Sequence, residues 1–238
     1  MIVLIMRSDI VSIVLAIIYL ITYLPVIHCD HSRITFSGYD WIVKIGYRMP
    51  GPNHFADIPF VYDGKLFLIA SRSNNGSWIT SEVFSTRKFG YGTYRFNVSS
   101  ELGNLHPNVV LGLFTWDWGS DYAHREIDVE FAKWGQKGIS TNAQYVVQPH
   151  QRKSNLKRFY RKVGLRPTIE QFTWSPEKIS FASLHDDRII SSWVYKGPNV
   201  PKKGNESVHM NVWLWKGRGP SDNKPIVIVI NSFEFIPL

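Results

Sequence analysis

The chain has 238 residues, of which 44% are hydrophobic and 14% aromatic, with a formal net charge of +8. This composition excludes a disordered or collagen-like chain and allows a packed core. Nine Trp, with 13 Pro and 17 Gly spread along the sequence, favour many short strands joined by turns over long helices. The single cysteine, Cys29, excludes an intramolecular disulfide and a cysteine-based zinc cage.

The first thirty residues indicate a membrane-directed segment. Residues 10–27 are uncharged over 18 positions, a length that suits either a signal peptide or a helix that only just spans a bilayer. Cleavage after Cys29 would leave a mature chain that begins near Asp30. We therefore expect residues 1–29 to be a signal peptide or membrane anchor and residues 30–238 to be one domain, secreted or membrane-anchored, outside the cytoplasm.

From residue 34 onward, short apolar segments are bounded by turn residues, without an internal repeat or a linker. The pattern predicts an all-β fold, a single antiparallel sandwich of roughly ten to fourteen strands. The clearest hairpin is residues 60–68, which turns at Asp63-Gly64, and a second is residues 171–181, which turns at Ser175-Pro176-Glu177. Further strands are expected in residues 93–98, 108–116, 126–131, 143–147, 188–195, 209–215 and 225–235.

Positive charge is concentrated in residues 152–166. This basic segment carries +7 of the formal +8 and has no acidic residue. The basic residues are Arg152, Lys153, Lys157, Arg158, Arg161, Lys162 and Arg166. A solvated loop with a helical turn explains the segment, and the alternative is a surface that holds an anionic glycan, cell wall or membrane. Nucleic acid is not an expected partner, because few aromatic residues are interleaved with the basic ones.

The sequence EIDVEF, residues 126–131, alternates acidic with apolar side chains. On a strand, Glu126, Asp128 and Glu130 share one face, and the apolar side chains share the other. Like charges on one face repel, so a fold retains such a strand only if something compensates. An oxygen-ligated cation such as calcium and a solvated polar face are two possibilities.

Acid and base catalysis on a glycosidic bond is the third possibility and the one we expect. That reaction needs one carboxylate ionised and another protonated, and close like charges separate pKa values in this way. Spacing alone leaves the stereochemistry open. The Cα atoms of Glu126 and Glu130 lie about 13 Å apart on an ideal strand, so the side chains must lean together on a curved sheet.

A second strand, residues 209–215 (HMNVWLW), supports a cleft. Alternation places His209, Asn211, Trp213 and Trp215 on one face. Aromatic rings beside an amide suit sugars, which offer apolar C–H faces and hydroxyl groups. Trp116 and Trp118 precede the acidic strand and extend the same side of the cleft, although each Trp alone is equally well explained as core.

Four motifs together carry a resemblance to a known family. They are REIDVEF, GYGTYRF (residues 90–96), SEVFS (residues 81–85) and MNVW (residues 210–213). From about residue 58 to 236 the chain resembles glycoside hydrolase family 16, a concanavalin A-like jelly-roll family of endo-β-glucanases, galactanases and transglycosylases. The resemblance implies that Glu126 is the nucleophile, that Glu130 is the general acid and then base, and that Asp128 holds and tunes both, with retention of configuration.

The resemblance also implies residues that bind the substrate. Glu82 is similar to a sugar-binding acid, and Asn211 with Trp213 to contacts with the sugar next to the cut, while Trp116 is expected beside them. The uninterrupted Glu-x-Asp-x-Glu spacing resembles lichenases and xyloglucan transglycosylases, whereas many laminarinases and agarases carry an extra residue. It therefore favours a β-1,3-1,4-glucan as substrate.

The chain departs from the lichenase pattern at two places. His124-Arg125 replaces a Trp-Asp pair before the acid motif, which makes the cleft more basic and less aromatic. Asn231 stands where the family has a calcium-binding Asp. These differences, with the basic segment, keep an anionic or decorated glycan open as substrate.

We therefore predict an exported, monomeric endo-β-glycanase that acts on a polysaccharide by double displacement, with no metal, redox or nucleotide cofactor. A non-catalytic lectin on the same sandwich is the alternative from another class, and it predicts glycan binding without product. Transglycosylation uses the same residues and differs only in whether water or sugar intercepts the intermediate. All of these require the three acids to project together into an open groove.

Overall fold

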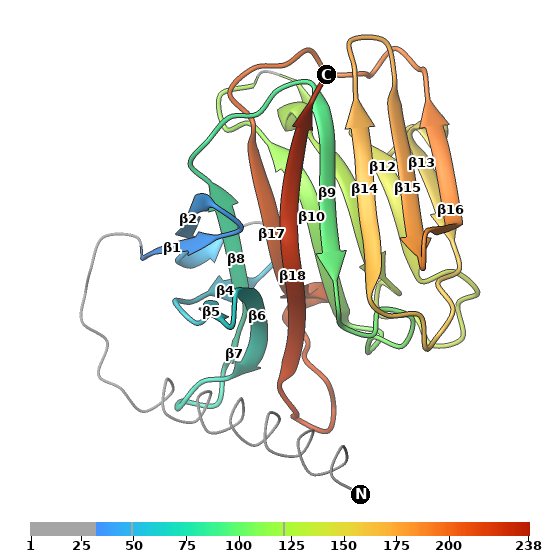
Figure 1. Cartoon of the computed structure of the whole chain (residues 1–238). Coiled ribbons are helices and arrows are strands. Elements are labelled where there is room, and N and C mark those ends of the chain that lie inside the picture. Colours follow the sequence, from blue (N-terminus) through green and yellow to red (C-terminus); the bar gives the residue numbers. More distant parts are fainter. Residues whose placement is uncertain (1–31, 49, 121) are drawn as a thin grey trace, which may run out of the picture.

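The computed structural model describes residues 32–48, 50–120 and 122–238, and the predicted export segment, residues 1–29, lies outside them (Figure 1). Among the described residues, no helix has the length and apolar character needed to cross a bilayer. The strands form two large antiparallel sheets, so the predicted β-sandwich of jelly-roll type is confirmed. The sequence undercounted the strands, because several span only two to five residues.

The first sheet carries the cleft described below and is called the cleft sheet. Its strand order is β1-β2-β8-β17-β10-β11-β12-β13. The strands are β1 (Arg33–Phe36), β2 (Tyr39–Val43), β8 (Ser81–Ser85), β10 (Val109–Trp116), β11 (Ile127–Ala132), β12 (Ala143–Val147), β13 (Leu156–Phe159) and β17 (Ser207–Leu214).

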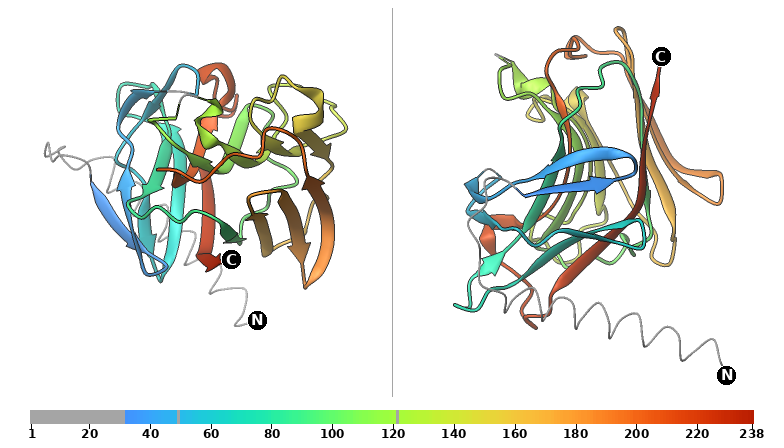
Figure 2. Two further views of the ribbon diagram at one scale, coloured as in Figure 1. Left: turned by 90° about the horizontal axis from the view of Figure 1, so that it is seen from above. Right: turned by 60° about the vertical axis from the view of Figure 1, so that its left-hand side comes forward.

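The second sheet, called the back sheet, has the order β16-β15-β14-β9-β18-β6-β5, with β7 paired to β6. The two layers face each other in Figure 2. The strands are β5 (Phe60–Tyr62), β6 (Lys65–Arg72), β7 (Trp78–Ile79), β9 (Gly92–Val98), β14 (Thr168–Trp174), β15 (Ile179–His185), β16 (Arg188–Tyr195) and β18 (Ile226–Pro237). A small separate pair and three single 3-10 turns complete the described elements: β3 (Gly46–Arg48), β4 (Asn53–Phe55), η1 (Ala123–Arg125), η2 (Lys153–Asn155) and η3 (Trp215–Gly217).

Both predicted hairpins are present. Asp63 and Gly64 have φ angles of 49° and 69°, the left-handed pair that a tight two-residue turn between β5 and β6 requires. In the second hairpin, β14 and β15 are joined by a turn in which Ser175 N donates to Lys178 O at 2.9 Å. Turn chemistry read from the sequence therefore fixes these two strand connections.

The hydrophobic core lies between the two sheets. On β11 the apolar residues of the alternating motif are fully buried in it, and on β17 so are the apolar residues between the predicted cleft residues. These core residues are Ile127, Val129 and Phe131 on β11 and Met210, Val212 and Leu214 on β17. Because alternate side chains on a strand point to opposite faces, burial of one set turns the acidic and aromatic sets away from the core.

The basic segment, residues 152–166, is only in part the solvated loop with a helical turn that its charge predicts: η2 is the turn, and Arg152, Lys153, Lys162 and Arg166 are exposed. It contains β13, which pairs with β12 at the edge of the cleft sheet. Arg161 is 0% exposed, and its Nη2 lies 3.4 Å from Oε1 of the equally buried Glu170. Arg158 lines the cleft. The compensating acid comes from β14, so counting charges within the segment could not reveal it; an anionic partner for the remaining basic residues stays a prediction.

Candidate active site

A cleft of about 870 Å³ lies over the outer face of the cleft sheet. Every residue predicted for the site lines it, from both the acidic strand and the neighbouring strands. These residues are Glu82, Trp116, Glu126, Asp128, Glu130, Asn211 and Trp213. The three acids thus project together into one groove, as the sequence analysis required.

The acid row consists of Glu126, Asp128 and Glu130. Glu126 directly precedes β11, and the other two lie on it. Asp128 is 3% exposed, whereas Glu126 and Glu130 are half-buried. A hydrogen bond joins the carboxyl groups of Asp128 and Glu126. Two neutral amides donate to the row: Gln148 Nε2 to Asp128 Oδ2 at 3.1 Å and Gln144 Nε2 to Glu130 Oε2 at 2.6 Å.

Burial dominates the protonation of this row. It raises the pKa of Glu130 to about 7, although the hydrogen bond from Gln144 and the charge of Arg158 lower it. Burial, with the charges of Glu130 and Glu82, raises the pKa of Glu126 to about 8. The hydrogen bond between Glu126 and Asp128 lowers the pKa of Glu126 and raises that of Asp128 further, so Asp128 keeps the shared proton.

Glu82 on β8 has the opposite environment, although it is 0% exposed. Lys44 Nζ donates to both carboxylate oxygens at 3.0 and 2.9 Å. His209 Nδ1 and Asn211 Nδ2 donate at 2.8 and 3.0 Å. Burial alone would raise the pKa of Glu82, but the hydrogen bond and charge of His209, with the charge of Lys44 and the amide of Asn211, lower it. The ionised carboxylate therefore fixes the orientation of three side chains that line the cleft.

Gly112 on β10 lies between the acid row and the side chains that contact Glu82. It is the cross-strand neighbour of Glu130 on one side and of Asn211 on the other. A Cβ at this position would lie 2.6 Å from Asn211 Oδ1, so only glycine leaves room for the amide as it is placed. The backbone at Gly112 thus allows the Asn211 side chain to lie close to the strand that carries the acids.

Three buried polar atoms that line the cleft have no hydrogen-bond partner in the described part of the chain: Trp116 Nε1, His209 Nε2 and Asn211 Oδ1. With Nδ1 of His209 donating to Glu82, its Nε2 is an acceptor in the neutral ring. Buried polar groups are rarely left unpaired. One donor and two acceptors are therefore available to groups of a ligand in the cleft.

Aromatic rings occupy two parts of the cleft lining. Trp116 stacks on His124 with ring centroids 4.0 Å apart and contacts Trp118 edge to face at 5.5 Å. A second group packs with centroids 5.1 to 6.2 Å apart. It consists of Trp134, Trp213 and Trp215. Such rings offer flat apolar faces at two places along the cleft.

Several cleft residues were not predicted as site residues. Lys44 follows β2, Gln144 and Gln148 lie on and after β12, Arg158 lies on β13, and Trp134 follows β11. Gln144 falls within a predicted strand, and its cross-strand neighbour is Glu130. Because Gln144 alternates with the apolar Ala143 and Tyr145, the sequence could have placed it on the cleft face of its strand. Only the strand pairing shows that it contacts Glu130.

No group of three His, Cys, Asp or Glu side chains in residues 32–238, apart from the two positions not described, is arranged to hold a metal ion. Asn231 stands where the family that the sequence resembles has a calcium-binding Asp. Its Nδ2 donates to Asn97 Oδ1 at 3.0 Å. The cleft acids interact instead with side-chain amides and with each other.

The fold is a jelly-roll β-sandwich, and solved structures of glycosidases have the same fold. A β-1,3-1,4-glucanase (lichenase) derived from a mouse hindgut metagenome matches with 20% identity and a TM-score of 0.63, covering 88% of this chain and 100% of its own. The β-glucanase of Bacillus licheniformis matches with 19% identity and a TM-score of 0.62, over 82% of this chain and 91% of its own. A laminarinase from Flavobacterium sp. UMI-01 matches with 14% identity and a TM-score of 0.64, covering 82% of this chain and 92% of its own.

No protein-family model and no curated protein matches the sequence. At these identities the structural likeness establishes the fold, and the function has to be argued from the site.

Proposed function

We propose that the protein is a retaining endo-β-glycanase that cleaves a β-glucan. The observation that carries the proposal is the acid row itself, with Glu126, Asp128 and Glu130 together on the floor of one cleft. Two further features support it: Glu130 has a pKa near neutrality, and tryptophan rings line the cleft at two places. A carboxyl group that holds its proton near neutral pH beside a second that can ionise is what glycosidic bond cleavage needs.

In the first step, the Glu126 carboxylate attacks the anomeric carbon as the bond to the leaving oxygen breaks. Glu130 gives its proton to that oxygen, and a glycosyl ester forms on Glu126. Asp128 keeps the proton that it shares with Glu126, and this hydrogen bond lowers the pKa of Glu126, which burial and the neighbouring acids raise to about 8, above the pKa of Glu130. The reacting form, with Glu126 ionised and Glu130 protonated, is therefore a minor protonation state of the free enzyme near neutral pH. Asp128 supports the nucleophile by hydrogen bonding.

In the second step, a water molecule attacks the anomeric carbon, gives its proton to Glu130 and releases Glu126. The ester has no charge, so its formation removes a like charge that interacts with Glu130 and favours Glu130 as the base. Two displacements on opposite faces restore the original configuration. The products therefore keep the anomeric configuration of the substrate.

The substrate that we propose is a β-1,3-1,4-glucan. The supports are the uninterrupted acid motif and the fold shared with solved proteins described as a β-1,3-1,4-glucanase and a laminarinase. Unpaired Trp116 Nε1, His209 Nε2 and Asn211 Oδ1 suit sugar hydroxyl groups, which both donate and accept hydrogen bonds. The N-terminal apolar segment agrees with action outside the cytoplasm, where such polymers occur.

The test replaces the proposed nucleophile in the full chain. Glu126→Ala should reduce the release of reducing ends from mixed-linkage β-glucan by roughly 10⁴-fold or more, because no glycosyl ester can form. With an activated aryl β-glucoside oligomer, added azide should restore turnover and give a glycosyl azide of inverted configuration. Product configuration is read by NMR.

Glu234→Ala is the matched control, because Glu234 is an exposed carboxylate on the back sheet that pairs with Arg95. It should retain wild-type turnover. Hydrolysis by Glu126→Ala without azide would remove Glu126 from the mechanism. Glycan binding by the wild-type protein without any product from a panel of neutral and sulfated β-glycans would establish a lectin instead.

A further inference from the structure

The turn that leads into Glu126 has an unusual backbone. Its three successive residues, Ala123, His124 and Arg125, have φ angles of 48°, 51° and 53°. The left-handed region is unfavourable for residues with a Cβ, and it is normally visited by single residues, not by runs. A run of three beside a candidate active site persists only where surrounding contacts hold it.

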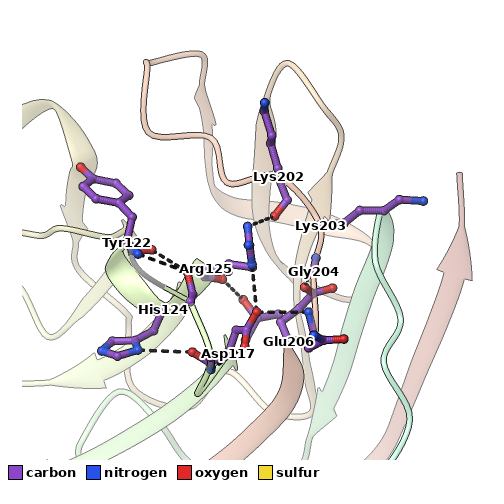
Figure 3. Close-up of polar contacts among 12 residues, drawn as sticks. Asp117, Tyr122, His124, Arg125, Lys202, Lys203, Gly204 and Glu206 are labelled. Carbon is purple, nitrogen blue, oxygen red and sulfur yellow. Dashed lines mark hydrogen bonds and ion pairs between the residues drawn. The ribbon is translucent and has the colours of Figure 1, made fainter.

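Arg125 and Asp117 supply such contacts (Figure 3). Arg125 Nε donates to Asp117 Oδ2 at 2.9 Å, and Arg125 Nη1 donates to the carbonyl of Lys202 at 2.7 Å. Asp117 is 4% exposed and also accepts from the backbone N–H groups of Gly119 at 2.9 Å and Asn205 at 3.1 Å. The ion pair therefore joins the turn to two loops, one after β10 and one before β17.

Gly204 allows this arrangement. A Cβ at Gly204 would lie 2.3 Å from Arg125 Nε, so any larger residue would displace either the loop or the guanidinium group. The loop before β17 thus approaches the turn more closely than a residue with a Cβ would permit. The close approach brings the Lys202 carbonyl within reach of Arg125.

The turn is directly bonded to the cleft residues. Glu126 N donates to Ala123 O at 3.0 Å, and Asp117 N donates to His124 O at 2.7 Å. The His124 ring, which lies between the two ends of the turn, stacks on Trp116 in the cleft lining. A change in the turn must therefore move both the proposed nucleophile and one aromatic part of the cleft.

We propose that Asp117 and Arg125 are positioning residues that hold the left-handed turn and thereby set the places of Glu126 and His124 in the cleft. The inference rests on the proposed function for its catalytic consequence, but the structural coupling stands without it. Neither residue touches the reacting atoms. Their effect passes through the backbone of the turn.

The first experiment is Arg125→Gln in the full chain. A small displacement of a reacting group lowers the rate steeply, so kcat should fall by roughly 10- to 100-fold while KM changes far less. The second variant adds Ala123→Gly to Arg125→Gln. Glycine adopts a positive φ without steric cost, so it should restore much of kcat if strain in the turn is what the ion pair opposes. A residue needed only for folding would not give this recovery in kcat at fixed KM.

Amide hydrogen exchange without any sugar provides a readout that is independent of activity. In Arg125→Gln, exchange at Glu126 and in residues 202–206 should become faster, and Ala123→Gly should slow it again at Glu126. Arg95→Gln, which breaks an exposed ion pair on the back sheet, is the matched control and should change neither exchange nor kcat.

Unchanged exchange and unchanged kcat in Arg125→Gln would overturn the proposal, and so would a loss that Ala123→Gly leaves unrelieved. If the wild-type protein cleaves no glycan, the proposed function fails, and the exchange data alone decide whether the ion pair holds the turn.

Discussion

Glu82 and the acid row lie on the same face of the cleft sheet and have opposite protonation, although burial acts on both. Glu82 receives four hydrogen bonds, two of them from the Lys44 ammonium, and its pKa is lowered. Asp128 and Glu130 each receive one bond from a neutral amide, and their pKa values are raised. Burial is common to both, so donors and cations decide which group is ionised. One group is a fixed charge that organises the cleft, and the other holds protons that a reaction can use.

The two groups are also coupled. Only β17 and β10 separate β8 from β11 in the cleft sheet, and Gly112 lies in register with both Asn211 and Glu130. The charge of Glu82 contributes to the raised pKa of Glu126. A change in the charge of Glu82 should therefore alter the pKa of Glu126 in the acid row.

The largest expected effect comes from Lys44→Met, which removes the ammonium group that pairs with the buried Glu82 carboxylate. Removing one partner of a buried ion pair leaves an uncompensated charge and should lower the free energy of unfolding by about 3–5 kcal/mol at neutral pH. The folded pKa of Glu82 lies below its ordinary value of 4.5, so the ionised carboxylate stabilises the protein above that pH. This contribution is lost as pH falls through the folded pKa. Urea unfolding at pH 7 and pH 4 should therefore show a much smaller difference between variant and wild type at the lower pH.

Arg95→Met is the control for Lys44→Met. It breaks the Arg95–Glu234 pair on the back sheet, in which both side chains are exposed. Exposed pairs contribute about 0–1 kcal/mol, so the loss should be small at both pH values. Equal losses of unfolding free energy in the two variants would show that Lys44 and Glu82 do not form a compensated buried ion pair.

The acid row and the face of β17 could be predicted because both depend on alternation within one strand. Glu126, Asp128 and Glu130 are separated by residues that enter the core, and so are the cleft residues of β17. The same logic gave the β5–β6 hairpin, since Asp-Gly fits the φ angles of its turn. Local patterns of this kind need no knowledge of which strands are neighbours.

The remaining site residues depend on pairing between distant segments. Lys44 meets Glu82 across 38 positions, and Gln144 meets Glu130 only because β11 and β12 pair in that register. Arg161 was interpreted as part of a solvated loop because its partner, Glu170, lies beyond the basic segment. The left-handed turn before Glu126 contains no glycine, so the sequence carries no sign of its backbone. Register and long-range charge pairing are what the sequence alone did not reveal.

Gln144→Met should change the protonation of the acid row without touching Glu82 or its partners. It removes the amide that donates to Glu130, one of the groups that lower the pKa of this acid. The pKa should then rise from about 7 by about one unit, the equivalent of one hydrogen bond. Because the proposed general acid, Glu130, must be protonated to react, the alkaline limb of the kcat/KM profile should move to higher pH. Gln171→Met is the control, because Gln171 lies on β14 of the back sheet, where its Oε1 accepts from Arg95 Nε at 3.0 Å; its limb should not move. A limb that moves to lower pH in Gln144→Met would contradict the assignment of Glu130.

Arg158→Gln should give the smallest effect, in the same direction. Arg158 lowers the pKa of Glu130 through its charge, whereas its own hydrogen bonds go to Thr141 and to backbone carbonyls. It is half-buried, so solvent screens its charge, and the alkaline limb should move upward by only a few tenths of a pH unit. Salt separates the two contributions, because screening weakens a charge at a distance but leaves a direct hydrogen bond in place. At 1 M salt, the pH profile of Arg158→Gln should therefore coincide with that of the wild type, while the profile of Gln144→Met stays at higher pH. If both profiles coincided with the wild type, Gln144 would act on Glu130 through long-range electrostatics and not through its 2.6 Å hydrogen bond.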